Sequence, residues 1–512
     1  MSTTAAATTR WADLADLVTT AGMRPTRTSL GPDGTLIGES PVCTPEDVAL
    51  ALSRARAAQA RWAQVPLPQR RAVLRRFAGV VLRHEVEILD LVQAESGKSR
   101  LSAFEELADV VLNAAYYARS GSRHLRPRRH RGALPILTRT TEHARPKGVV
   151  GVISPWNYPL TLAVSDAVPA LLAGNAVVVK PDSLTPFTAL LAVRLLRAAG
   201  LPEDALQVVT GPGSVLGSPL IAGVDAVMFT GSTETGRTVA RQCADRLIGF
   251  SAELGGKNPM LVLDDADLGR AVEGAVQACF SNSGQLCVSI ERMYVADAVY
   301  DAFVPALVER VRRMRVGPGP GWDIEMGSLI SSEQLARVAG HVDDAVARGA
   351  RVLVGGRPRP DLGPLFYEPT VLVGVTEAMT VARQETFGPV VAVYRVADDD
   401  EAVERANDTE YGLNASIWSR RRGPAVAGRV RAGTVNINEG YAATWGSHGA
   451  PIGGMGDSGV GRRHGRAGVV AYTEPQTVSA QRLLPVGPSP ALPGERYVRV
   501  ISAAAAIIRR LP

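Results

Sequence analysis

Several features that would place this chain in a particular class are scarce or missing. Four cysteines, Cys43, Cys243, Cys279 and Cys287, occur in 512 residues, and no two of them form a Cys-x-x-Cys pair. So few cysteines exclude the disulfide framework of a small secreted domain. The seven histidines are scattered without the spacing of metal ligands, so the sequence predicts no metal site.

Long apolar runs are also missing. No segment approaches the roughly 20 apolar residues of a membrane-spanning helix, and the N-terminal residues lack the apolar core of a secretory signal. We therefore expect a cytoplasmic protein with no membrane partner. Hydrophobic residues make up 46% of the chain and charged residues 21%, a balance typical of folded enzymes. A chain of 512 residues exceeds one compact core, so we expect two or three domains.

Lysine is rare in this chain. Of the 56 basic residues only four are lysines, Lys98, Lys147, Lys180 and Lys257. An ammonium group is more compact than a guanidinium, so a lysine retained among so many arginines is a candidate for a specific role. Codon usage is the alternative explanation for the arginine excess.

The most basic segment is residues 123–131, within a chain whose formal net charge is +6. Such a run binds nucleic acid or an anionic surface in some proteins. It contains no interleaved aromatic residues and is broken by Pro127. We interpret it as a solvated linker and expect no nucleic-acid partner.

The N-terminal third is predicted to be helical after an irregular arm at residues 1–40. Thr44 is a good N-cap, and Pro45 suits the first helical position. Further helices are expected near residues 67–84, 85–96 and 101–118. A strand-like segment follows at residues 137–146.

From residue 148 the pattern changes to alternating strands and helices. Buried strands are expected at 148–154, 176–181, 206–209 and 226–229, with helices at 160–173 and 185–199. Continuous β-branched runs joined by helical crossovers predict a parallel sheet covered on both faces, so residues 148–255 are predicted to be a nucleotide-binding α/β domain. A second α/β region, 256–455, is expected to hold helices at 266–280, 297–315 and 332–348 and strands at 292–296, 351–354 and 390–394. A last strand, 477–484, precedes a Pro-rich tail, 485–512, with a short helix at 496–511.

Two segments suit a nucleotide ligand. Residues 229–236 contain Gly231 and Ser232, follow a buried strand and open a helix, and backbone amides at such a helix start favour a pyrophosphate. Lys180 ends another strand, where ligands bind in open α/β sheets. A solvated lysine at a strand terminus is the alternative.

The candidate nucleophile is Cys287, at the end of the segment 281–287. A lone cysteine is usually a small buried hydrophobic residue. Glu253 and Asn157, like Cys287, lie in Gly- or Pro-rich segments that follow a strand or helix, which is where scaffolds present reactive groups. A thiol, a carboxylate and a carboxamide beside a dinucleotide site suit the covalent oxidation of an aldehyde.

Six motifs resemble the aldehyde dehydrogenase superfamily, in that family's order and over about residues 40–480. They are Pro155-Trp156-Asn157-Tyr158-Pro159, Phe229-Thr230-Gly231-Ser232, Glu253-Leu254-Gly255-Gly256-Lys257-Asn258-Pro259, Gly284-Gln285-Leu286-Cys287, Glu385-Thr386-Phe387-Gly388-Pro389 and Gly453-Gly454-Met455. The bacterial NADP-dependent succinate-semialdehyde dehydrogenase branch is the most similar.

The resemblance implies an α/β fold with three parts. A Rossmann-like cofactor domain would comprise residues 41–136 and 148–255, and an α/β catalytic domain residues 256–455. A small β oligomerisation arm would comprise 137–147 and 477–484. The resemblance further implies a homodimer or homotetramer.

The resemblance also implies the site's roles. The Cys287 thiolate would attack the aldehyde, the Asn157 carboxamide and the Cys287 backbone N–H would hold the oxyanion, and Glu253 would activate water. Glu385 would hold the nicotinamide ribose, with Phe387 packed nearby. The other implied cofactor contacts are Trp156, Asn157, Lys180, Pro181, Asp182, Ser183, Gly231, Ser232 and Leu254.

The chain departs from the family's pattern at several positions. Ser183 stands where NAD-preferring members carry a glutamate. The replacement of that glutamate by serine favours NADP, although NAD remains possible and the charge of Asp182 could offset part of the preference for NADP. Ser165 and Ser281 stand where branch members place arginines that clamp the substrate carboxylate. Residues 439–449, with Tyr441, Trp445 and His448, are an alternative anchor.

We therefore expect an enzyme that oxidises succinate semialdehyde to succinate with NADP. Another aldehyde with NAD is an alternative. An acylating relative that passes the acyl group to a thiol cofactor would lack the base that Glu253 provides. A non-catalytic member of the fold would be expected to lose Cys287 or Glu253, and both are present.

Overall fold

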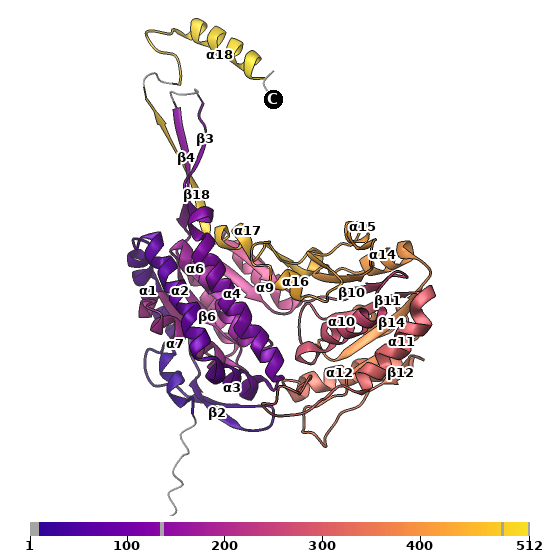
Figure 1. Ribbon diagram of the computed structural model, residues 1–512. Helices are drawn as coiled ribbons and strands as arrows, with labels where there is room; N and C mark the ends of the chain where they lie inside the picture. Colours follow the sequence, from indigo (N-terminus) through magenta and orange to yellow (C-terminus); the bar gives the residue numbers. More distant parts are fainter. Residues whose placement is uncertain (1–9, 134–137, 483–485, 510–512) are drawn as a thin grey trace, which may run out of the picture.

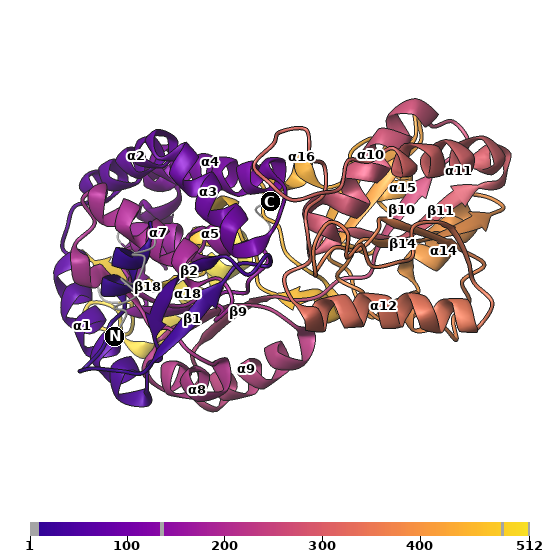
Figure 2. The same cartoon turned by 90° about the horizontal axis from the view of Figure 1, so that it is seen from below.

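The structure is a computed structural model that describes residues 10–133, 138–482 and 486–509. Four predicted segments lie partly outside the described residues: 1–9 of the N-terminal arm 1–40, 137 of the strand 137–146, 483–484 of the strand 477–484, and 510–511 of the helix 496–511. Figures 1 and 2 show two lobes side by side, and Figure 1 shows a narrow arm that projects from one of them. Within the described ranges, no helix is long and apolar enough to cross a membrane.

The first lobe is built on a sheet of six strands. Their order is β17 (Gly459–Val460), β9 (Gly249–Glu253), β8 (Ala226–Thr230), β5 (Val149–Ile153), β6 (Ala176–Lys180) and β7 (Leu206–Val208). All neighbours pair in parallel except β17 with β9. The chain runs from β5 to β6 and β7 on one side and to β8 and β9 on the other. The strand order therefore reverses beside β5, where open α/β sheets bind ligands at the carboxyl ends of their strands.

Helices and one hairpin surround this sheet (Figure 1). They are η1 (Ala12–Leu17), β1 (Thr26–Leu30), β2 (Leu36–Pro41), α1 (Pro45–Trp62), α2 (Leu67–Arg83), α3 (Glu85–Ser96), α4 (Arg100–Leu125), α5 (Pro159–Val164), α6 (Ala167–Ala173), α7 (Pro186–Ala198), η2 (Glu203–Ala205), α8 (Gly213–Gly223), α9 (Thr233–Asp245), η4 (Gly456–Ser458) and α17 (Gly465–Val470). The predicted capping of α1 is confirmed, because Thr44 and Asp47 form a capping box before Pro45.

The second lobe contains a sheet of seven strands. Their order is β12 (Arg351–Val354), β13 (Thr370–Val373), β14 (Val390–Val396), β11 (Ile290–Ala296), β10 (Asn258–Val262), β15 (Asn414–Trp418) and β16 (Thr434–Ile437), all parallel except β12 with β13. The other elements are α10 (Leu268–Phe280), η3 (Ser281–Gly284), α11 (Asp297–Arg312), α12 (Ser332–Ala347), α13 (Thr380–Arg383), α14 (Asp399–Asn407), α15 (Gly423–Ala427) and α16 (Ala442–Trp445). The predicted α/β class, with parallel sheets under helices, is confirmed.

Three strands form the projecting arm in the order β18 (Thr473–Gln481), β4 (Thr138–Pro146), β3 (Arg128–Arg131), and α18 (Gly494–Ile508) lies beyond them (Figure 1). Two expectations were wrong here. Part of the basic run is the exposed strand β3, not a linker, because Arg128 faces Glu142 in an antiparallel register with β4. The last strand begins at Thr473, four residues before its predicted start.

Two other expectations also need correction. Within the described part of residues 1–40 the chain is not irregular, since β1 and β2 form an antiparallel hairpin that buries Ile37. The single helix expected at 160–173 is two helices, α5 and α6, separated at Ser165 and Asp166. Ser165 donates its hydroxyl to Asp109, and Asp166 pairs with Arg463. Polar contacts of both residues therefore accompany the break.

Candidate active site

Cys287 follows a strained turn between η3 and β11. Asn282, Ser283 and Gly284 have φ angles of 49°, 56° and 69°, so three consecutive residues are left-handed, a conformation that only glycine adopts freely. A Cβ at Gly284 would lie 2.1 Å from the carbonyl oxygen of Gly388. Such strain persists only where the surroundings hold it, and it concentrates at functional sites.

Buried polar contacts hold this turn against the first lobe. Asn282 Nδ2 donates to the backbone oxygens of Asn157 and Gln285, each at 3.0 Å. Ser283 Oγ donates to the carbonyl of Gly327 at 3.0 Å. Asn258 Nδ2 donates to the carbonyl of Cys287 at 2.8 Å. The backbone on both sides of the thiol is therefore fixed.

Asn157 lies beside the thiol loop, as the oxyanion role requires. Its side chain is 4% exposed, and Nδ2 donates to the carbonyl of Gln285 at 3.1 Å. A carboxamide nitrogen carries two hydrogens, so one remains to donate to a substrate oxygen. Both Asn157 and Cys287 line the same cavity.

That cavity has a volume of about 290 Å³ and opens at the carboxyl ends of β5, β8 and β9. Besides Cys287, the lining includes seven of the predicted cofactor contacts, namely Trp156, Asn157, Gly231, Ser232, Leu254, Glu385 and Phe387. It also includes the start of α12, with Gln334 and Arg337, which sequence reasoning missed.

The residues of this cavity fit a dinucleotide. A Cβ at Gly231 would lie 2.7 Å from Phe229, and one at Gly255 would lie 2.7 Å from Glu385, so both glycines keep space that a side chain would fill. Ser232 caps α9, since its hydroxyl accepts from the Thr235 amide at 3.3 Å. The N-terminus of this helix favours a phosphate.

Glu385 is held at the other end of the same cavity. It accepts the Gly256 amide at 2.8 Å, and burial raises its pKa to about 7. Phe387 packs edge-on against Trp156, with ring centroids 5.5 Å apart. The two aromatic rings and this carboxylate together form one wall.

Four predicted cofactor contacts are not among the lining residues of this cavity, namely Lys180, the last residue of β6, and Pro181, Asp182 and Ser183, which follow it. Lys180 is 5% exposed and donates to the carbonyl of Pro181 at 2.8 Å. Asp182 accepts the Leu184 amide at 2.9 Å, so one of its oxygens is engaged in its own turn. Ser183 is half-buried.

A second, enclosed cavity lies on the other side of Cys287. Glu253 and Cys287 both line it, together with Tyr441, Trp445 and Arg463. Glu253 is 5% exposed, its Oε1 has no hydrogen-bond partner among the described residues, and burial raises its pKa to about 7. Burial, with the charge of Glu253, raises the pKa of Cys287 to about 12. The cavity therefore holds an unpartnered carboxylate together with the thiol, and this carboxylate can act as a base toward a water molecule.

The residues expected to anchor a substrate tail are only partly brought together. Tyr441 and Trp445 line the second cavity, whereas His448 is not among its lining residues. Ser165 donates to Asp109 Oδ2 at 2.8 Å. The basic side chain in the lining is Arg463, which pairs with Asp166 at 2.6 Å. Arg463 was not predicted.

Residues 25–478 match the aldehyde dehydrogenase family, over most of the chain. The chain belongs to that family. It is 54% identical over 474 residues to a Mycolicibacterium smegmatis protein named putative succinate-semialdehyde dehydrogenase, NADP(+), with 92% of each chain covered. The predicted family and enzyme class are confirmed.

Solved structures of the family superpose closely on this aldehyde dehydrogenase. An E. coli NADP-dependent enzyme has a TM-score of 0.87 at 33% identity, covering 91% of this chain and 97% of that one. A succinate-semialdehyde dehydrogenase from Burkholderia pseudomallei has a TM-score of 0.85 at 35% identity, covering 89% and 95%.

Two ion pairs that the sequence did not predict support this aldehyde dehydrogenase site. Lys98 Nζ donates to Glu106 at 2.6 Å and to the Asn157 carbonyl at 2.7 Å. Lys257 pairs with Glu291, which accepts the amides of residues 386 and 387. The signal was the rarity of lysine, because Lys98, Lys180 and Lys257 are all buried.

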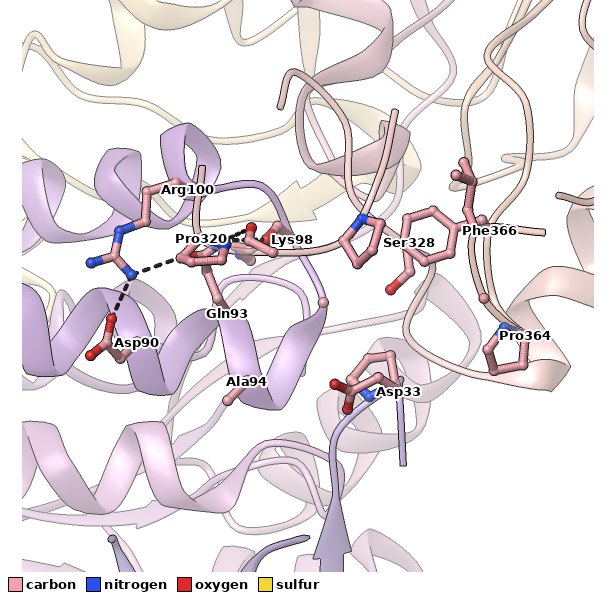
Figure 3. Close-up of a pocket in the computed structure, with 16 residues that line it drawn as sticks. Asp33, Asp90, Gln93, Ala94, Lys98, Arg100, Pro320, Ser328, Pro364 and Phe366 are labelled. Carbon is pink, nitrogen blue, oxygen red and sulfur yellow. Dashed lines mark hydrogen bonds and ion pairs between the residues drawn. The ribbon is translucent and has the colours of Figure 1, made fainter. Parts of the chain in front are cut away.

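A further cavity of about 260 Å³ lies away from Cys287, where the two lobes meet beside α3 (Figure 3). Its charged groups are already paired, as Arg100 donates to Asp90 at 2.7 Å and to Gln93 at 2.9 Å. None of its described lining side chains is an unpartnered buried polar group. It therefore lacks the reactive chemistry found around Cys287.

Proposed function

We propose that this enzyme oxidises succinate semialdehyde to succinate with NADP as the hydride acceptor. The observation that carries the oxidation is the place of Cys287, which lines both the cavity whose residues fit a dinucleotide and the enclosed cavity that holds Glu253. The substrate is inferred from the name of the 54%-identical relative.

The chain's own groups supply the proton transfers. A neutral thiol is a poor nucleophile, so Cys287 first loses its proton to water, and the thiolate sulfur then adds to the aldehyde carbon. The Asn157 carboxamide and the Cys287 backbone N–H donate to the resulting oxyanion, and one such donor contributes roughly 3–4 kcal/mol. NADP would supply the hydride acceptor when bound, and loss of the hydride would leave a thioester on Cys287. Glu253 then takes a proton from water as that water attacks the thioester, and the acid leaves with the sulfur restored.

The preference for NADP rests on Ser183. A glutamate at this position would repel a ribose phosphate, which carries roughly −1.5 to −2 charge, whereas serine is neutral and can donate. Lys180 adds a positive charge beside it, and the Asp182 side chain bonds within its own turn. These features support a cofactor with a 2′-phosphate.

The substrate carboxylate requires a positive partner in the enclosed cavity. The two positions at which the resemblance implied arginines are Ser165 and Ser281. Arg463 supplies the guanidinium in that lining, and its Nε has no partner among the described residues. We assign Arg463 this electrostatic role, with Tyr441 and Trp445 forming the walls.

The proposed domains and assembly follow the three sheets. The first lobe would bind the cofactor and the second would carry the nucleophile. The arm would pair with a second copy through its edge strand β18, because β4 already lies between β18 and β3. Eight of the nine residues of β18 are exposed, and an exposed edge strand is a ready template for pairing. We propose a homodimer or homotetramer, which size-exclusion chromatography with light scattering tests.

The experiment for the substrate is a kcat/KM panel over aldehydes of equal length that carry a carboxylate, an amide or an ammonium at the far end, each with NADP and NAD. The carboxylate with NADP is expected to give the highest value. A higher value for the neutral or cationic aldehyde would contradict the assigned substrate and leave aldehyde oxidation intact.

A further inference from the structure

Three buried side chains outside the reaction path meet between α4 and the loop that follows α16. They are Asp109 of α4, His448 of the loop, and His464, the residue before α17, exposed by 3%, 5% and 5%. Each offers one ligand atom, and these atoms all lie within 4.8 Å of one another. The prediction that the histidines are scattered holds along the sequence, but the fold brings two of them together.

Their polar atoms are left without partners. Asp109 Oδ1, both ring nitrogens of His448, and His464 Nδ1 are buried and make no hydrogen bond within the described part of the chain. His448 Nε2 lies 3.8 Å from the Asp109 carboxylate, too far for a hydrogen bond. Buried polar groups are nearly always satisfied, so four such atoms at one place point to a missing ligand.

His464 is also held in a strained backbone. Its φ is 58° and its ψ is 173°, a region that is essentially restricted to glycine and that costs about 1–3 kcal/mol for other residues. A histidine at a position that favours glycine indicates that the imidazole itself is needed there. This observation is independent of the unpartnered atoms.

The space and the ligand set select the occupant. The cavity lined by Asp109 and His464 has a volume of about 10 Å³, and His448 is not among its lining residues; this space is too small for an organic molecule. A neutral imidazole ligates a metal through one of its ring nitrogens, and both ring nitrogens of His448 are free to do so within the described part of the chain. Two imidazoles and one carboxylate suit Zn²⁺, which binds them at about 2.0–2.2 Å.

We propose that Asp109, His448 and His464 bind a zinc ion that fastens the loop of residues 446–464 to α4, with water as the fourth ligand. The support around the site fits this assignment. Ser165 Oγ donates to Asp109 Oδ2 at 2.8 Å, which leaves Oδ1 to face the metal, an orientation typical of hydrogen-bonded metal ligands.

The ion would position the substrate cavity rather than take part in the reaction. The loop it fastens leads from Trp445 through Ile452 to Arg463, and all three residues line the enclosed cavity beside Glu253. Loss of zinc is therefore expected to raise KM for the aldehyde more than KM for the cofactor.

The test uses the full-length enzyme with a tag free of histidine. After chelator treatment, the protein is dialysed against Zn²⁺, freed of unbound metal and measured by mass spectrometry of the element; about one ion per chain is expected. Co²⁺ in place of Zn²⁺ is expected to give the visible absorption of a four-coordinate site. Asp109→Asn and His448→Gln should each lose the ion, whereas His341→Gln should keep it. His341 is the matched control because it is buried and already pairs with Thr386 at 3.2 Å.

A fourth variant, His464→Gly, separates ligation from folding. It removes a ligand and relieves the strained backbone, so it should lose the ion while the metal-free protein melts at an equal or higher temperature than metal-free wild type. A wild-type enzyme that retains no zinc would mean that the site holds only an ordered water, and this result would overturn the proposal. Equal zinc in wild type and in all three site variants also overturns it.

Discussion

The raised pKa of Glu253 predicts a specific pH dependence of turnover. Glu253 is buried and its pKa is about 7 against an ordinary 4.5. Its carboxylate form must accept a proton from water, so the activity is present above pH 7 and is lost as the pH falls through 7. About a tenth of the Glu253 side chains are ionised at pH 6 and about nine-tenths at pH 8. Hydrolysis of the thioester should therefore be about tenfold slower at pH 6 than at pH 8.

The assay is rapid mixing of enzyme, NADP and aldehyde, with reduced cofactor followed by absorbance from pH 5.5 to 8.5. A burst followed by a steady phase reports acylation and hydrolysis separately. Glu253→Gln should keep a burst and show a slow steady phase that no longer changes between pH 6 and 8. Glu385→Gln is the matched control, because Glu385 has a pKa of about 7 as well but lines only the cofactor cavity. It should retain the pH dependence of hydrolysis. A wild-type steady phase that is flat from pH 6 to 8, with hydrolysis rate-limiting, would refute the raised pKa.

Three further predictions concern other parts of the site. Ser183→Glu should shift the NADP-to-NAD ratio of kcat/KM toward NAD by at least about tenfold, or about 1.4 kcal/mol, and an unchanged ratio would sink the role given to Ser183. Cys287→Ala should abolish dehydrogenation while calorimetry still detects cofactor binding. The control Cys279→Ala, at a buried cysteine of α10, should stay active. A Cys287→Ala enzyme with a tenth of wild-type kcat would contradict covalent catalysis. Lys98→Met leaves the Glu106 carboxylate buried without its ion-pair partner and should destabilise the protein by about 3–5 kcal/mol. The control Lys147→Met, at the exposed ion pair with Glu474, should cost at most about 1 kcal/mol. Equal shifts of the urea midpoint in the two variants would contradict this prediction.

The sequence predicts the regular elements of this protein well where one physical signal dominates. Continuous runs of β-branched residues predicted β5, β6 and β8, and an N-cap residue followed by proline predicted the start of α1. The hairpin β1–β2 was missed because its strands are short and mostly exposed. The break between α5 and α6 was missed because it involves contacts with Asp109 and Arg463, which are distant in sequence.

The site shows the same division between local and long-range information. Motifs identified Cys287, Glu253 and Asn157, but not the groups that hold them. Lys98 reaches the Asn157 carbonyl from 59 positions away, and Arg463 lines the enclosed cavity from the segment after β17. His448 and His464 are 16 positions apart in irregular backbone, so no helical or strand spacing could relate them. Rarity of lysine was a usable signal for Lys98 and Lys257, whereas one arginine among so many gave none for Arg463.

The most direct test of the central claim is the site of acylation. Glu253→Gln is mixed with aldehyde and NADP, quenched in acid, digested and analysed by mass spectrometry. The account predicts a mass increase equal to the acyl group on the peptide that contains Cys287, dependent on NADP and removed by hydroxylamine. An acyl group on another residue, or none while the variant shows a full burst, would contradict covalent oxidation at Cys287.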